Sequence, residues 1–142
     1  MENFVSFELA KKLKDKGFEL KEPYAMYNEL GDFHKLYTSA EERVPNRNYR
    51  EYYDYCDFDD MDFVAPTISQ VLKWMRVQHK IHIEFVSSVY GYNFIISGTP
   101  EEGGIYIYGS AVNYDGPNDG GAWDTVEEAA MASIIYVLDK LI

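Results

Sequence analysis

Apolar residues recur at helical spacing in three parts of this chain, and each part begins with a residue that caps a helix well. The first predicted helix starts after Ser6, whose hydroxyl can accept a bond from a free N–H of the first turn. It ends at Gly17, because glycine takes the left-handed backbone conformation that closes a helix at little cost. Phe18 then falls where a Schellman motif brings an apolar side chain back onto Leu13.

Two later helices share a second signal, a Thr followed three residues later by Gln or Glu. Side chains at these two positions satisfy each other's free N–H groups. One helix is predicted from Thr67 to about His79, and the other from Thr125 to the last residues. Their apolar stripes, which we expect to be buried, consist of Ile68, Val71, Leu72, Trp74 and Met75 in the first and Val126, Ala130, Ile134, Val137, Leu138 and Leu141 in the second.

Five short runs have the composition or the alternation of strands. Residues 23–28 and 33–38 flank a Gly-containing turn, which predicts an antiparallel hairpin. Residues 81–85, 92–96 and 104–108 follow the second helix, with Gly- and Pro-containing turns between them. In the last run, isoleucines alternate with tyrosines. We expect the helices to cover the aliphatic face and the tyrosines to line the exposed one.

These elements follow one another in the order α-β-β-α-β-β-β-α, with no internal repeat or linker. An antiparallel sheet of about five strands with helices packed on one face is the simplest assembly, so we expect an α+β fold. At 142 residues the chain suits a single domain spanning residues 1–142, and 46% apolar residues supply enough material for a core.

The chain is strongly acidic, which excludes some classes of function. Thirteen Lys and Arg against 24 Asp and Glu give a net charge of −11, which repels phosphate backbones and anionic membranes. The order of elements from Thr67 onward invites comparison with a double-stranded RNA-binding domain. Such domains hold phosphates with basic residues near the start of the last helix, where this chain has Asp124, Glu127 and Glu128. We therefore expect neither direct nucleic-acid binding nor membrane binding.

The sequence shows no signal for secretion or membrane insertion. Its first residues lack the apolar core of a secretory signal, and no run approaches the roughly 20 apolar residues that a membrane span needs. The single Cys56 excludes an intrachain disulfide. We expect a cytoplasmic protein.

Residues 39–63 form a long irregular stretch rich in acidic and aromatic residues, and loops of this length inside a domain are often functional. Tyrosines offer contact area and aspartates select a basic partner, so this stretch is our candidate interaction surface. A hard cation could also use these carboxylates, although they lack the Gly and the closing Glu of an EF-hand loop. The plainest alternative is a solvated loop whose rings fold back onto the sheet. The candidate residues are Tyr49, Tyr52, Tyr53, Tyr55, Asp57, Asp59, Asp60 and Asp62.

Other combinations of reactive residues are weaker. The glycine-rich residues 113–121 lack the Gly-Lys-Ser/Thr of a phosphate-binding loop and do not match GxGxxG, so we interpret them as a turn-rich connection. His79 and His82 could bind zinc only if Cys56 or His34 folded beside them. Cys56 could act as a nucleophile only beside a histidine. We assign no catalytic residue, no cofactor and no metal.

Several phrases of the sequence resemble a group of small bacterial proteins of the gut Bacteroides type, some of which are carried by phage or mobile elements. The matching phrases are residues 5–14 with Gly17 and Phe18, residues 65–74, residues 79–84 and residues 125–142. Where the group often has Gly after the second helix, this chain has Lys80. Because the phrases are mostly caps and core stripes, the resemblance implies a shared fold and brings no assigned activity.

Three functions stand as hypotheses. We expect a non-enzymatic interaction or accessory protein that binds a protein partner, or itself, through an acidic, tyrosine-rich surface. A sharper alternative is an acidic DNA mimic that inhibits a nucleic-acid-binding enzyme, which requires carboxylates spaced like phosphates on one face. The third is an enzyme or small-ligand binder with a pocket beside residues 39–63 and at least one group of shifted pKa. That pocket would contain several of Tyr52, Tyr53, Tyr55, Asp57, Asp59 and His34.

Overall fold

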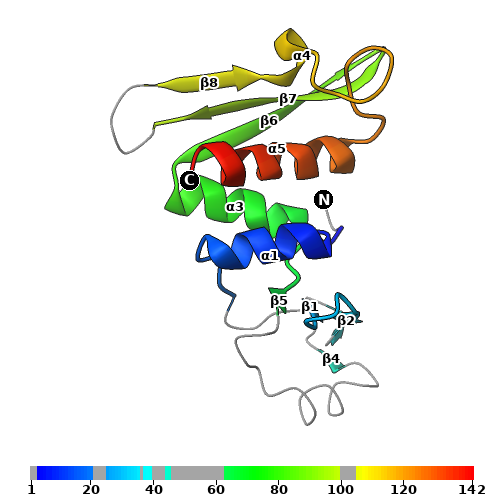
Figure 1. The fold of residues 1–142 in the computed structure, drawn as a ribbon, viewed down its shortest axis with the longest axis vertical. Coiled ribbons are helices and arrows are strands. Elements are labelled where there is room, and N and C mark those ends of the chain that lie inside the picture. The colour runs from blue at the N-terminus through cyan, green and yellow to red at the C-terminus, as the bar shows by residue number, and fades with distance from the viewer. Residues whose placement is uncertain (1–2, 21–24, 36, 40–43, 46–62, 100–104) are drawn as a thin grey trace. The chain divides into compact units, whose positions relative to one another are not determined.

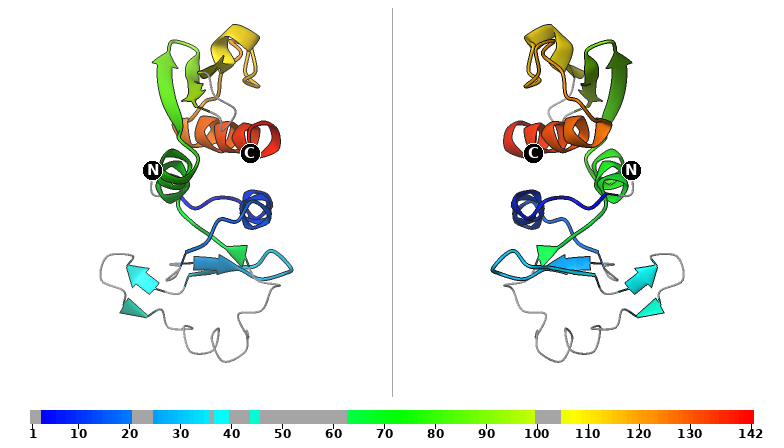
Figure 2. Two further views of the ribbon diagram at one scale, coloured as in Figure 1. Left: turned by 90° about the vertical axis from the view of Figure 1, so that its left-hand side faces the viewer. Right: turned by 90° about the vertical axis from the view of Figure 1, so that its right-hand side faces the viewer.

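The protein has an α+β fold, as predicted, and its chain divides into two compact units. The computed structural model describes residues 3–20, 25–35, 37–39, 44–45, 63–99 and 105–142. Residues 1–3 and 68–142 form the C-terminal unit, and residues 4–67 form the N-terminal unit. Figures 1 and 2 show the helices and strands of each unit.

The C-terminal unit is a three-stranded antiparallel sheet with two long helices on one face (Figure 1). Strands β6 (Ile81–Ser88), β7 (Gly91–Gly98) and β8 (Tyr106–Gly109) lie in the order β6-β7-β8. Helices α3 (Ile68–Gln78) and α5 (Val126–Lys140) pack against each other and against the sheet. The three strands and two helices predicted for this half of the chain are thus confirmed. A short helix, α4 (Ser110–Asn113), follows β8.

The core of the C-terminal unit lies between the sheet and the helices. Leu72 and Trp74 of α3, and Val126 and Leu141 near the ends of α5, belong to the predicted stripes but are only half-buried. Burial of a large apolar side chain stabilises a fold by roughly 1.5–3 kcal/mol. The large apolar side chains buried in this unit are Ile68, Val71, Met75, Ile81, Phe94, Ile96, Ile134, Val137 and Leu138.

Helix α5 starts with the cap that the sequence predicts. The Thr125 hydroxyl accepts a hydrogen bond from the Glu128 N–H at 3.2 Å, and the first turn is acidic, which suits the positive end of the helix dipole. We expect Thr125→Ala to lower the free energy of unfolding by about 1 kcal/mol, because it removes the acceptor for that N–H. Urea denaturation measures the change, and Thr125→Ser, which keeps the hydroxyl, is the matched control. Equal stability of the wild type and Thr125→Ala would contradict this role of the cap.

Two residues after the end of helix α3 lies a residue with an unusual backbone conformation. Lys80 has a φ of +57°, in the left-handed region that glycine adopts most easily. Its Nζ donates to the Val77 carbonyl at 3.3 Å. The chain therefore enters β6 through the backbone turn that a glycine would give. A lysine in this conformation costs about 1 kcal/mol relative to glycine.

Helix α1 (Phe7–Asp15) of the N-terminal unit has both of its predicted ends. The Ser6 hydroxyl accepts a hydrogen bond from a backbone N–H of the first turn at 3.3 Å. At the other end, Gly17 has a φ of +84° and the Phe18 N–H donates to the Leu13 carbonyl at 3.0 Å. This is the bond of a Schellman motif, and both apolar partners are buried.

The predicted hairpin forms in the N-terminal unit, but neither the single sheet of about five strands nor the exact order of elements is confirmed. Strand β1 (Ala25–Tyr27) pairs with β2 (Phe33–Lys35) on one side and with β5 (Phe63–Val64) on the other. Strand β3 (Tyr37–Ser39) pairs with β4 (Val44–Pro45). Among the described strands, none of these joins β6, β7 or β8. Separate small sheets result because the strands are short and β1 already has a neighbour on each side.

The covered face of β8 is the opposite of the expected one. Ile105 and Ile107, which we expected to face the helices, are 81% and 70% exposed. Tyr108 pairs with Ile96 of β7, and cross-strand partners share a face, so the tyrosine lies on the side of the buried isoleucine. Its ring stacks on Tyr136 of α5, with the ring centroids 4.2 Å apart. The expectation that the helices cover the β8 isoleucines is therefore wrong.

The chain leaves the C-terminal unit and returns to it at neighbouring positions. The Ile68 N–H donates to the Asn3 carbonyl at 2.9 Å. Next to them, Phe4 and Thr67 face each other in an antiparallel bridge. The N-terminal unit is thus inserted between Asn3 and Ile68, and its first and last residues pair in one short ladder.

Candidate interaction surface

The residues that the sequence singles out for an interaction surface lie outside the described residues. Among the described residues, a surface with similar chemistry lies on the C-terminal unit. It is formed by the β6–β7 turn and by residues 113–124, and we call residues 113–124 the glycine loop. A binding role for the sequence candidates stays a prediction. These candidates are Tyr49, Tyr52, Tyr53, Tyr55, Asp57, Asp59, Asp60 and Asp62.

One asparagine holds the glycine loop together. Asn118 Oδ1 accepts hydrogen bonds from the N–H groups of Gly120 and Ala122 at 3.0 and 2.9 Å. Its Nδ2 donates to the Tyr90 carbonyl at 2.8 Å and to Asp124 Oδ1 at 3.1 Å. The amide therefore uses both acceptor positions and both hydrogens. A single side chain ties the loop to itself and to the β6–β7 turn.

At Gly116 and Gly121 of the glycine loop, close packing leaves no room for a side chain. A Cβ atom at Gly116 would lie closer than 3.0 Å to three backbone atoms of Ala122. Gly121 has a φ of +70°, and a Cβ atom there would overlap the Tyr114 ring. Tyr114 itself has a φ of +57°, which is uncommon for a bulky residue. The sequence thus specifies one backbone path for this loop.

The glycine loop is also joined to the sheet. Tyr92 and Trp123 exchange two backbone hydrogen bonds, of 2.8 and 2.9 Å, in an antiparallel bridge beside the β6–β7 turn. The Trp123 ring packs on Phe94, with the ring centroids 5.3 Å apart. A loop that is already fixed in this way loses little further conformational entropy when it binds a partner.

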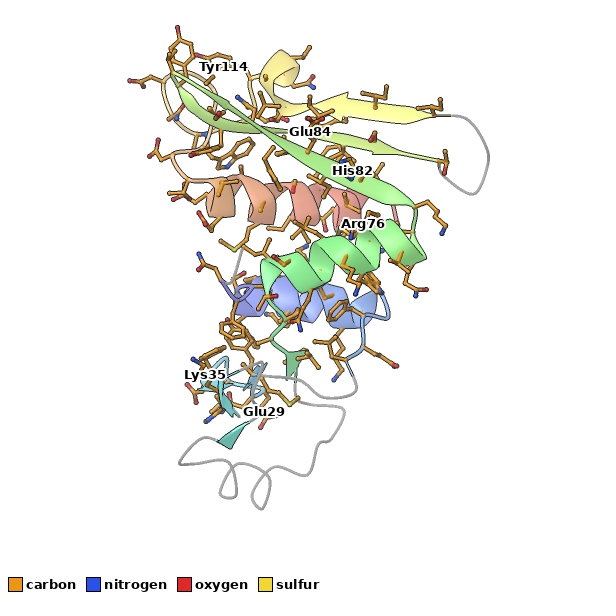
Figure 3. All side chains as sticks on the ribbon, turned by 180° about the vertical axis from the view of Figure 1, so that it is seen from behind. Glu29, Lys35, Arg76, His82, Glu84 and Tyr114 are labelled. Atoms are coloured by element: carbon orange, nitrogen blue, oxygen red, sulfur yellow. The ribbon has the colours of Figure 1, made fainter. Side chains whose placement is uncertain are left out.

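The glycine loop and the β6–β7 turn expose carboxylates and aromatic rings together. Asp115, Asp119 and Asp124 are exposed, and so are Tyr90 and Tyr114. We call these five residues the acidic tip, and Figure 3 labels Tyr114 among them. Residues 81–139 contain nine Asp and Glu and no Lys or Arg. The surrounding chain therefore supplies no lysine or arginine to neutralise the tip.

Two tyrosine hydroxyls brace the acidic tip. The Tyr114 hydroxyl donates to the Asp119 backbone carbonyl, and the Tyr108 hydroxyl donates to the Asp115 carboxylate. The interpretation of residues 113–121 as a turn-rich connection misses this surface. The sequence features that could have indicated this surface are Gly120 and Gly121, shortly after Asn118, and the absence of Lys and Arg around them.

A second exposed feature is the outer face of the β6-β7-β8 sheet, on the side away from α5. Val86 and Ile107 are exposed there, and Ile95 is half-buried. His82 and Glu84 of β6 share this face and are exposed as well (Figure 3). Exposed apolar side chains gathered on one face are common at sites of protein contact.

Ser110, at the start of α4, is buried and has a structural role. Its Oγ donates to Asn93 Oδ1 and accepts from the Phe94 N–H, both at 2.9 Å. These bonds fasten α4 to β7. Because the hydroxyl is buried and used twice, it is closed to a substrate.

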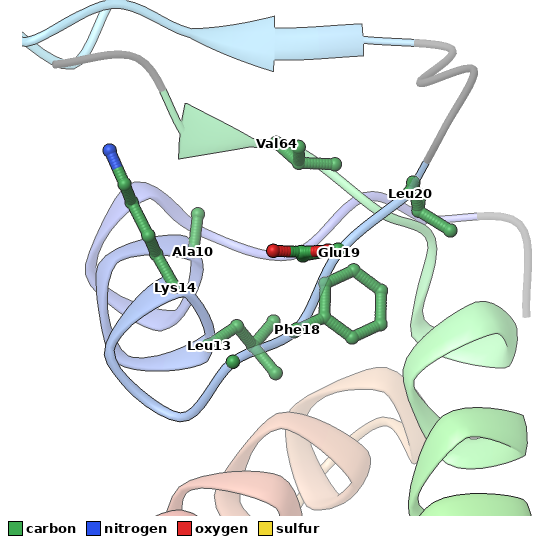
Figure 4. Close-up of a pocket in the computed structure, with 8 residues that line it drawn as sticks. Ala10, Leu13, Lys14, Phe18, Glu19, Leu20 and Val64 are labelled. Carbon is green, nitrogen blue, oxygen red and sulfur yellow. The ribbon is translucent and has the colours of Figure 1, made fainter. Parts of the chain in front are cut away.

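The N-terminal unit contains a cavity of about 410 Å³ beside the end of α1 (Figure 4). The ionisable residues among its described lining are Lys14 and Glu19, and Lys14 Nζ lies 4.9 Å from the centroid of the Phe63 ring. Of the residues expected in a ligand pocket, His34 alone is described, and it lies on β2 outside this lining. The described lining residues are Ala10, Leu13, Lys14, Gly17, Phe18, Glu19, Leu20 and Val64.

Tyr27 and His79 have contacts that suit a structural role. Burial raises the pKa of the Tyr27 phenol, whose hydroxyl donates to the Val5 carbonyl at 2.6 Å, so the phenol keeps its proton at neutral pH. His79 packs edge-on against Trp74, with the ring centroids 4.6 Å apart, and His82 is exposed on β6. In the part of the chain that the structure describes, no group of three His, Cys, Asp or Glu side chains could hold a metal ion.

No protein-family model, curated protein or solved structure matches this chain. The resemblance to small bacterial proteins therefore stays a prediction. Among the residues that the structure describes, no helix is long and apolar enough to cross a bilayer. The geometry of the acidic tip and of the outer face is thus the basis for assigning a function.

Proposed function

We propose that this chain is a non-enzymatic interaction protein that binds a basic segment of a partner protein through the acidic tip. The observation that carries the proposal is the glycine loop. It holds five exposed anionic or aromatic side chains together, with no Lys or Arg from residues 81–139 to balance them. The proposal places at a surface of the C-terminal unit the same combination of aromatic rings and carboxylates that we expect of residues 39–63.

An Arg or Lys of the partner gains from both kinds of side chain at the acidic tip. The carboxylates attract a cation over a range of roughly 8 Å at physiological salt. A tyrosine ring adds about 0.5–1 kcal/mol for an exposed cation–π contact. Because the glycine loop is fixed before binding, little of this gain is lost in ordering it. Tyrosine is enriched at protein–protein interfaces, so the two rings of the tip favour protein binding over DNA mimicry.

Selection from a random peptide library on the immobilised protein tests the proposed function. We expect the enriched peptides to contain Arg or Lys, since the acidic tip favours positive charge. Their affinity should fall as salt is raised, because salt screens attraction between exposed charges. Enrichment of neutral or acidic peptides would contradict the proposal.

A charge reversal then locates the binding site. Asp119→Lys is expected to lower the affinity for the selected peptides about tenfold, because the attraction between residue 119 and a basic peptide becomes a repulsion. The loop keeps its bond from Tyr114, which goes to the backbone carbonyl of residue 119. Glu29→Lys, in the exposed β1–β2 turn of the N-terminal unit, makes the same change of charge and serves as the control. Equal weakening by the two variants would show a response to net charge alone.

A further inference from the structure

Strand β6 lies at an edge of its sheet, and this edge is long and regular. It pairs with β7 over all eight residues with no shift of register. Among the described strands, none pairs with its other side. Proteins usually block such an edge with a proline, a lysine or a β-bulge. Strand β6 has none of the three.

The helix-facing side of β6 is incompletely covered. Ile83 pairs with Ile96 and Phe85 pairs with Phe94, so each pair shares a face of the sheet. The two β7 residues are buried, whereas Ile83 and Phe85 are only half-buried. Part of the apolar surface on the core side of the sheet is thus exposed at the edge strand β6.

The other side of β6 carries two polar groups of complementary kind. His82 and Glu84 are exposed, two residues apart and on the same face (Figure 3). An imidazole N–H can donate to a carboxylate whether the ring is neutral or charged. If two β6 strands pair antiparallel about Ile83, His82 of each copy faces Glu84 of the other. The same register places Ile81 opposite Phe85 on the core side.

We propose that a second copy of this chain occupies the edge of β6, in antiparallel pairing about Ile83, so that two three-stranded sheets become one. The pairing supplies partners for the open backbone groups of residues 81–85. It brings the half-buried Ile83 and Phe85 against the same residues of the second copy, which removes apolar surface from water. Pairing about Glu84 would set two carboxylates face to face, whereas the register about Ile83 is the one that sets His82 against Glu84.

Sedimentation equilibrium of the full chain tests this dimer and does not depend on the proposed function of the acidic tip. We expect a reversible monomer–dimer equilibrium. His82→Glu should raise the dimer dissociation constant about tenfold, because two favourable cross-strand pairs become two repulsive ones. A wild type that stays monomeric at the highest soluble concentration overturns the proposal.

A charge swap identifies the register. The double variant His82→Glu with Glu84→Lys restores opposite charges across the pair, and its dissociation constant should return to within about threefold of the wild type. Both side chains are exposed, so the fold tolerates the changes. Val112→Glu adds a negative charge on α4 and should leave the dimer unchanged. A swap that fails to restore the dimer, or an equal effect of Val112→Glu, places the contact elsewhere and overturns the proposal.

Discussion

Replacing Gly116 by alanine is expected to lower the free energy of unfolding by about 3 kcal/mol, because the new methyl group must displace backbone. A Cβ atom at this position would meet the backbone of Ala122 and not the flexible end of a side chain. The glycine loop must therefore open or shift. Since Asn118 bonds across the same loop, the shift also breaks its hydrogen bonds to Gly120 and Ala122.

Urea denaturation followed by tryptophan fluorescence measures this loss, since Trp123 lies at the end of the glycine loop. Gly109→Ala is the matched control. A Cβ atom there would lie 3.8 Å from Val112 Cγ2, an ordinary contact, so its effect should stay within about 0.5 kcal/mol. Similar stabilities for the two variants would show that the loop is looser than its packing indicates. Gly116→Ala should also lower the affinity of the acidic tip for the selected peptides.

Two isoleucines of the same sheet are expected to differ sharply when each is changed to alanine. Ile96 on β7 is fully buried, and its truncation should cost about 3–4 kcal/mol through lost apolar contact and the cavity left behind. Ile107 on β8 is exposed, and its truncation should cost less than about 1 kcal/mol.

The midpoint of urea denaturation, followed by circular dichroism, gives both values under identical conditions. Each variant is the control for the other, because the residue type and the substitution are the same. An equal loss for the two variants would mean that the isoleucine side of β8 is covered, as the sequence pattern suggests. The predicted difference follows from the register, which places Tyr108 on the side of Ile96.

The parts of the fold that could be predicted are those decided by neighbours in sequence. Ser6 and Thr125 cap their helices with their own hydroxyls, and Gly17 ends α1 with its own backbone. The three strands after α3 follow from alternation and turns. Each of these signals acts over a few residues, so it can be identified without knowing the rest of the structure.

The parts that could not be predicted depend on distant partners. Alternation separates isoleucines from tyrosines in β8 but does not say which side faces α5, and the stacking of Tyr108 on Tyr136 decides that. Strand β5 is two residues long, too short for a pattern, yet it completes the small sheet of β1. Asn118 gains its role from the Tyr90 carbonyl, 28 residues away. The sequence shows the glycines and the lack of Lys and Arg at the acidic tip, but not the hydrogen bond that joins it to Tyr90.

The short ladder at Phe4 and Thr67 has a consequence for how this chain can evolve. Residues 4–67 enter and leave through adjacent backbone positions, so their length and content can change without moving the ends that they connect. The sheet, the acidic tip and the edge of β6 all belong to the remaining residues. We therefore expect changes of length inside residues 4–67 to leave the two connections at Asn3 and Ile68 side by side.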